Sequence, residues 1–132
     1  MTALLSLLAA LALAGSQSDS TRVERSDGEV REVAMRHTSD VQHCYESEGL
    51  RRNPTLLGTL EVELTILPTG VVDSVTIAAS SMRGPGTTEV ARCLTRVARN
   101  WRFTRGPFVV ETIVFPFRFT PESPYQVRPA SS

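Results

Sequence analysis

The chain has 132 residues, of which 41% are hydrophobic, and its 14 acidic side chains balance 14 basic ones. This length supports one domain with short tails and excludes a second core of any size. Every basic residue is Arg, and the formal net charge of zero argues against a general affinity for nucleic acid.

The N-terminus combines an apolar run over residues 3–14 with two small residues, Ala12 and Ala14, on either side of Leu13. Small residues at that spacing are typical of a signal-peptide cleavage site. The apolar run is shorter than the length of about 20 residues that a membrane-spanning helix needs. We therefore expect a signal peptide over residues 1–14, a periplasmic or secreted protein, and no stable membrane span. A buried N-terminal helix is the alternative.

Residues 15–25 are polar and are expected to form a flexible lead-in. Ser26 followed by Glu29 matches a capping box, which favours the start of a helix. Apolar residues then recur at helical spacing as far as Gly49, a residue type that often follows the last helical turn. The sequence predicts a first helix that begins at Ser26 and ends near Gly49.

The clearest pattern in the chain is a strand hairpin within residues 58–79. Polar and apolar residues alternate from Thr59 to Ile66, which is typical of a strand with one face on a core. Pro68 and Gly70 then break the run, and β-branched residues resume at Val71. We expect an antiparallel hairpin with Gly70 at positive φ in its loop.

A second helix and a last strand complete the predicted fold. Thr87 or Thr88 can cap the helix, and residues 109–119 are rich in strand formers. Pro116 lacks an N–H and so fits an edge or an irregular point. Residues 120–132 are rich in Pro and Ser and should form a flexible tail. The order α-β-β-α-β indicates an α+β fold with two helices packed on one face of a small antiparallel sheet.

Cys44 and Cys93 fall on the core-facing sides of the two predicted helices. In an oxidising compartment they should pair, and a disulfide closing a loop of about fifty residues would stabilise the fold by about 4 kcal/mol. The alternatives are two buried thiols, a nucleophile, or a metal site with His37 or His43. Because no C-x-x-C motif and no third strong ligand are present, we expect no metal and no cofactor.

Three Arg residues, Arg92, Arg96 and Arg99, lie on one side of the second predicted helix, away from its apolar stripe. Such a surface suits acidic cell-wall polymer, phospholipid head groups or an acidic protein. A solvated helix face, neutralised in part by the acidic residues of the first helix, is the alternative. No nucleophile, base and orienting group can be assembled as a set, so we expect a non-catalytic protein.

Several short motifs, in their order and spacing, resemble the C-terminal domain of TonB-type proteins, and more closely the variant at the C-terminus of AgmX-type gliding-motility proteins. The resemblance covers residues 35–119 and identifies residues 26–119 as a domain of this kind. The motifs include His43-Cys44-Tyr45-Glu46, Thr69-Gly70-Val71-Val72, Val90-Ala91-Arg92-Cys93-Leu94, Trp101-Arg102-Phe103 and Val114-Phe115-Pro116-Phe117-Arg118-Phe119.

The resemblance implies a module of the bacterial cell envelope that binds an envelope protein or peptide segment. TonB-like domains recruit peptide segments at a sheet edge, where backbone N–H and C=O groups lack partners. We expect the last strand to be that edge and the Arg surface to assist it. The expected contact residues are Val109, Glu111, Ile113, Phe115 and Phe117.

Two other functions remain open at this point. One is an envelope thiol enzyme or metal protein that uses Cys44, His37 and Cys93. The other is an adaptor that binds peptidoglycan through its Arg residues. The aromatic residues of the last strand also have a purely structural interpretation, since alternation along a strand directs about half of its side chains into the core.

Overall fold

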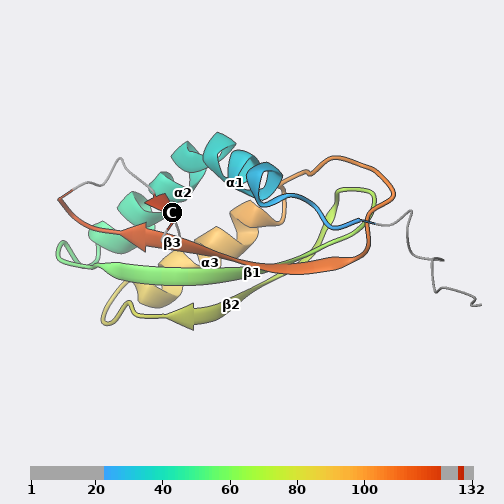
Figure 1. Ribbon diagram of the computed structural model, residues 1–132. Helices are drawn as coiled ribbons and strands as arrows, with labels where there is room; N and C mark the ends of the chain where they lie inside the picture. Colours follow the sequence, from blue (N-terminus) through green and yellow to red (C-terminus); the bar gives the residue numbers. More distant parts are fainter. Residues whose placement is uncertain (1–22, 123–127, 130–132) are drawn as a thin grey trace, which may run out of the picture.

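The computed structural model describes residues 23–122 and 128–129, so the predicted signal peptide lies outside the described residues. Figure 1 shows the elements in chain order. They are helices α1 (Asp27–Arg36) and α2 (Thr38–Cys44), the π-helix η1 (Tyr45–Leu50), strands β1 (Gly58–Ile66) and β2 (Val72–Ser80), helix α3 (Thr87–Ala98), and strands β3 (Glu111–Phe119) and β4 (Arg128–Pro129).

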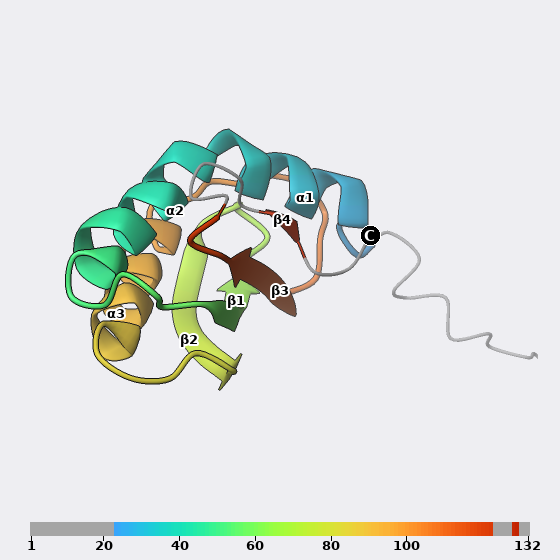
Figure 2. The same ribbon diagram turned by 90° about the vertical axis from the view of Figure 1, so that its left-hand side faces the viewer.

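The strands form one antiparallel sheet in the order β2-β1-β3-β4, and the helices cover one of its faces (Figures 1 and 2). The connection through α3 carries the chain across the sheet, so β3 pairs with β1 and not with β2. The predicted α+β class and the order α-β-β-α-β are confirmed. The short strand β4 is an addition that the sequence pattern did not predict.

Strands β1 and β2 form the predicted hairpin. Alternate residues of β1 are buried, and Gly70 in the loop has a φ of 88°. A Cβ atom on Gly70 would lie 2.0 Å from the carbonyl oxygen of Phe103, whose N–H donates to the Gly70 carbonyl. Both the positive φ and this close approach therefore require glycine. The buried residues of β1 are Leu60, Val62, Leu64 and Ile66.

The core lies between the sheet and the helices. A disulfide joins Cys44 of α2 to Cys93 of α3, with an S–S distance of 2.03 Å, so the predicted pairing is confirmed. Trp101, just after α3, is 1% exposed and meets the ring of Phe117 edge-on. Burial of these large side chains contributes most of the driving force for folding. The other buried aromatic residues are Tyr45, Phe103, Phe115 and Phe119.

The predicted first helix is not continuous: His37 separates α1 from α2. The hydroxyl of Thr38 donates to the Met35 carbonyl oxygen over 2.7 Å, a bond that competes with regular helix geometry. The helical stretch ends at Leu50, close to the predicted end near Gly49, but Gly49 lies inside η1 and does not follow its last turn. A Cβ atom there would lie 2.7 Å from the side chain of Val90, so this glycine permits close packing of α3.

The prediction of a flexible lead-in is wrong for residues 23–25. The side chain of Arg25 is 0% exposed, and its guanidinium donates to the carbonyl oxygens of Leu67 (3.0 Å) and Thr104 (2.5 Å). It also lies 4.2 Å from the ring centroid of Phe108. A planar guanidinium with several donors can satisfy carbonyl groups and an aromatic face together, which explains why this charge is buried.

The prediction of a flexible tail over residues 120–132 is wrong for residues 128–129, which form β4 and pair with Arg118 and Phe117 of β3. Residues 123–127 and 130–132 lie outside the described part of the chain. The folded domain therefore extends beyond the predicted boundaries 26–119 at both ends.

Candidate functional site

The sheet offers two edge strands, and β2 is the less suitable for pairing with another chain. Its register with β1 shifts twice, which leaves Asp73 and Ala78 without a partner on β1. Bulges of this kind interrupt the hydrogen-bond ladder and twist the edge strand. An exposed charge such as Asp73 disfavours the addition of another strand. Both features protect the β2 edge.

Strand β3 is regular by comparison. It pairs with β1 without a register shift from Gly58 opposite Phe119 to Ile66 opposite Glu111. The ladder runs through Pro116, which lies opposite Glu61. A proline removes no hydrogen bond between two strands when its nitrogen faces away from the neighbouring strand. The outer side of β3 is therefore the unbulged edge of this sheet.

Hydrogen bonds at the end of β1 show which backbone groups of β3 face outward. The N–H of Thr59 donates to the Ser81 hydroxyl over 2.8 Å, and its carbonyl accepts from the Ser81 N–H over 2.9 Å, so Thr59 faces the β2 side. Odd-numbered residues of β1 thus face β2, and even-numbered ones bond to odd-numbered residues of β3. The even-numbered residues of β3 face outward. These are Thr112, Val114, Pro116 and Arg118.

Two segments of the same chain occupy the ends of this outer edge. At one end, Arg118 pairs with Arg128 of β4. At the other end, Val23 runs parallel to the chain at Phe108 and accepts a hydrogen bond from the Val109 N–H over 3.4 Å. On the side that faces away from β1, no residue that the structure describes pairs with residues 112–116. We call this free stretch of the edge the β3 slot.

The structure assigns different roles to the expected contact residues. The side chains of Glu111, Phe115 and Phe117 are buried, that of Ile113 is partly buried, and their backbone groups face β1. The N–H of Val109 is bonded to Val23. The backbone groups that face outward in the β3 slot belong instead to the even-numbered residues of β3.

A groove runs along the β3 slot between the strand and α1, and Figure 2 shows α1 and β4 at this side of the sheet. One hollow of about 210 Å³ is lined by Val30 and Arg31 of α1 together with residues 113–116. A second hollow of about 260 Å³ is lined by Glu24, Arg25 and residues 109–113. Asp27 and Ile113 line both hollows, so the two adjoin at the first turn of α1.

The sequence pattern did not single out these groove residues of α1 and of the segment before it. Asp27, Val30 and Arg31 appear in the sequence as ordinary members of a capped amphipathic helix. Only the pairing of β3 with β1, together with the buried Arg25, places that helix turn beside the slot. No local signal could have identified them.

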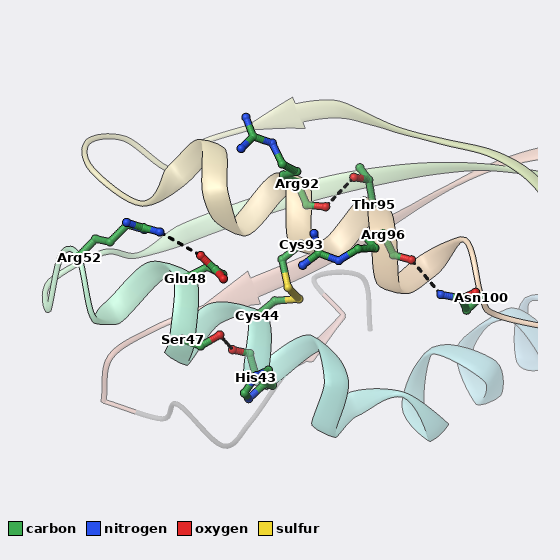
Figure 3. Close-up of a disulfide and its surroundings, with 10 residues drawn as sticks. All are labelled: His43, Cys44, Ser47, Glu48, Arg52, Arg92, Cys93, Thr95, Arg96 and Asn100. Carbon is green, nitrogen blue, oxygen red and sulfur yellow. Dashed lines mark hydrogen bonds and ion pairs between the residues drawn. A yellow bond between two sulfur atoms is a disulfide. The ribbon is translucent and has the colours of Figure 1, made fainter.

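The Arg surface of α3 lies elsewhere. Helix α3 packs on β2 and β1, so it lies on the helical face towards the β2 edge, away from the slot (Figure 2). Arg92 and Arg96 lie on either side of Cys93 along α3, near the disulfide (Figure 3). They line a hollow of about 160 Å³ together with Glu48 and Glu89. Arg92, Arg96 and Arg99 are exposed, and none forms an ion pair within the described residues. The slot and the Arg surface are therefore separate.

The residues of the alternative thiol or metal site are already engaged in other contacts. The sulfur atoms of Cys44 and Cys93 bond to each other, which leaves no thiolate while the disulfide is intact. The ring of His37 stacks on Trp101 with its centroid 5.3 Å away, and its Nδ1 lies 3.4 Å from a carboxylate oxygen of Asp40. Over residues 23–122 and 128–129 no group of three or more His, Cys, Asp or Glu is placed to hold a metal ion.

Comparison with family models, curated proteins and solved structures found no match to this chain. Within the described residues no helix has the length and apolar character needed to cross a membrane. The disulfide is compatible with an oxidising compartment.

Proposed function

We propose that this protein is an exported, non-catalytic module of the bacterial cell envelope that binds an extended peptide segment of a partner protein along the β3 slot. The observation that carries this proposal is the contrast between the edges of the sheet. Edge β2 is bulged twice, whereas β3 is regular and leaves the outward side of residues 112–116 without a described partner. Proteins usually protect a regular edge, so an unprotected one beside a groove favours pairing with a partner.

The motifs that resemble the C-terminal domains of TonB-type and AgmX-type proteins support the same function. In such domains a partner segment adds to the sheet as a further strand. The resemblance includes the last strand of this chain, whose outer backbone groups at Thr112 and Val114 would donate and accept the new hydrogen bonds.

A pair of substitutions at Val114 tests the proposal. Its side chain is 48% exposed, so replacing it leaves the core intact. Val114→Pro removes the outward N–H, whereas Val114→Ala keeps it and serves as the matched control. Peptides would be selected on the native protein from a random display library and then measured on both variants. We expect them to bind Val114→Ala and to lose binding to Val114→Pro, and equal binding to both would exclude the slot.

Export is part of the proposal and has its own test. The apolar run over residues 3–14 and the disulfide both favour an oxidising compartment outside the cytoplasm. In an exporting bacterial host the mature protein should start at Gly15, and its thiols should resist alkylation until they are reduced. Retention of Met1 with two reactive thiols would contradict export.

An adaptor that binds peptidoglycan is a second candidate, favoured by the exposed Arg92, Arg96 and Arg99 on α3. Cosedimentation with purified cell walls should then fall as salt rises, because exposed charges are screened. Replacing the three Arg residues with Gln should abolish it. Cosedimentation that the triple variant retains would remove this candidate.

A further inference from the structure

The β3 slot presents different chemistry on its two sides. Directly opposite residues of neighbouring strands project their side chains to the same face of a sheet. In a bound strand, the residues opposite Thr112 and Val114 would therefore face the open side of the sheet. The residues opposite Ile113 and Phe115 would face α1.

The open side of the slot is apolar in part. Val110 is 58% exposed and Val114 is 48% exposed, although both belong to a residue type that is usually buried. A β-branched residue on the bound strand would cover Val114 and remove apolar surface from water.

The side that faces α1 is acidic at one end only. Glu24 and Asp27 line the hollow that extends to Ile113, and neither side chain forms an ion pair or a hydrogen bond with another described residue. Two other charged residues line this hollow, and both are engaged within the chain. The Arg25 guanidinium is buried and bonded to carbonyl oxygens, and the carboxylate of the buried Glu111 accepts the main-chain N–H of Arg25. At the other end of the slot Arg31 lines the groove. Two carboxylates that have no ion-pair partner among the described residues therefore lie next to the position opposite Ile113.

We infer that the β3 slot binds an extended segment of another protein that carries Lys or Arg opposite Ile113 and β-branched apolar residues on both sides of it. The long stem of such a side chain would lie along Ile113 while its charge reaches Glu24 and Asp27. The inference rests on the proposed function and adds the chemistry of the partner segment.

Two pentapeptides of the same composition test the inference and report the direction of binding. In an antiparallel arrangement the first peptide residue lies opposite Pro116, so the acetylated and amidated peptide Val-Ser-Val-Lys-Val places Lys opposite Ile113. In a parallel arrangement the peptide Val-Lys-Val-Ser-Val does so. Each has a counterpart with Glu in place of Lys, which should be repelled by Glu24 and Asp27.

Binding would be measured by NMR titration of the isotope-labelled protein at low salt, with the amides of Thr112 and Val114 as reporters. We expect one of the two Lys peptides to bind at least about fivefold more tightly than its Glu counterpart, the scale of one exposed charge pair. The preference should vanish in the double variant Glu24→Gln/Asp27→Asn. It should persist in the control Glu32→Gln, because Glu32 lines neither hollow.

Three results would overturn the inference, and they separate it from the proposed function. Equal binding of Lys and Glu peptides that is still lost in Val114→Pro would remove the charge preference and keep the edge-pairing function. No shift of the Thr112 and Val114 amides with any peptide would reject both. Shifts that depend on protein concentration alone, with dimers in sedimentation, would assign the slot to a second copy of this chain.

Discussion

Glu29 accepts hydrogen bonds from both the N–H (2.8 Å) and the hydroxyl (2.6 Å) of Thr104, a residue 75 positions further along the chain. Ser26 caps α1 as predicted, but the Glu29 carboxylate does not complete the capping box. It instead ties the first turn of α1 to the segment between α3 and β3. This contact helps to hold α1 beside the slot.

The contact predicts a loss of stability in acid. Burial alone raises the pKa of Glu29, but the bonds from Thr104 and the charge of Arg25 outweigh it, so the pKa lies below its ordinary value of 4.5. A lowered pKa in the folded state means that Glu29 stabilises the fold above pH 4.5. This contribution is lost as the pH falls through the folded-state pKa.

We expect Glu29→Gln to lower the free energy of unfolding at pH 7 by about 1–2 kcal/mol and to reduce the further loss between pH 7 and about pH 3. Urea unfolding of both proteins at the two pH values measures this. Glu32→Gln, on the exposed side of the same helix, is the control. An unchanged acid dependence in Glu29→Gln would show that Thr104 does not stabilise the carboxylate.

Two glycine substitutions should have opposite effects. Ala at position 70 would place a Cβ 2.0 Å from the Phe103 carbonyl oxygen at a φ of 88°, so Gly70→Ala should destabilise by about 2 kcal/mol or more. Gly28 lies in α1, where the nearest atom to an added Cβ is 3.8 Å away. Gly28→Ala should therefore stabilise by about 0.4–1 kcal/mol. Thermal unfolding measures both, and a stable Gly70→Ala protein would contradict the loop geometry.

The features that the sequence predicts correctly are the local ones. The alternation in β1 identifies its buried face, Gly70 identifies the loop, and helical spacing places Cys44 and Cys93 on facing sides. Each depends on residues that are close in the chain or on a periodicity that one element carries by itself. The fold class follows from the order of such elements.

The features that the sequence did not predict depend on distant partners. A period of two predicts which face of the sheet each side chain occupies, but it does not predict which neighbouring strand each backbone N–H and C=O group bonds to. The outward-facing residues of β3 can therefore be identified only when its pairing with β1 is known. Arg25 lies in a polar stretch without periodicity. Its main-chain N–H donates to the carboxylate of Glu111, 86 residues away, so a local pattern could not indicate its burial.

Tyr45 should make the fold sensitive to alkaline conditions. Its hydroxyl donates to the Leu56 carbonyl oxygen, and burial, followed by the charge of Glu122, raises its pKa to about 12 from the ordinary 10.0. A raised pKa means that the neutral phenol stabilises the fold fully below pH 10 and that this contribution is lost as the pH rises through about 12.

Tyr45→Phe should cost about 1 kcal/mol at pH 7, because one hydrogen bond is lost, and should unfold with a weaker dependence on pH above 10. The ultraviolet absorbance of tyrosinate checks the assignment independently. The chain has two tyrosines, and the step that titrates near pH 12 should disappear in Tyr45→Phe and remain in Tyr125→Phe. The opposite pattern would contradict it.

The disulfide should contribute a large share of the stability of this small domain. It closes a loop with a sequence separation of 49 residues and joins α2 to α3. In the chain-entropy model such a loop stabilises the fold by about 4 kcal/mol, a large fraction of the 5–15 kcal/mol that is typical of domains. We expect Cys44→Ala/Cys93→Ala to unfold at a much lower urea concentration than the oxidised protein. A reducing agent should shift the native protein towards the variant and leave the variant unchanged. If reduction leaves the urea midpoint of the native protein where it was, packing of α2 on α3, not the covalent link, holds the two helices together.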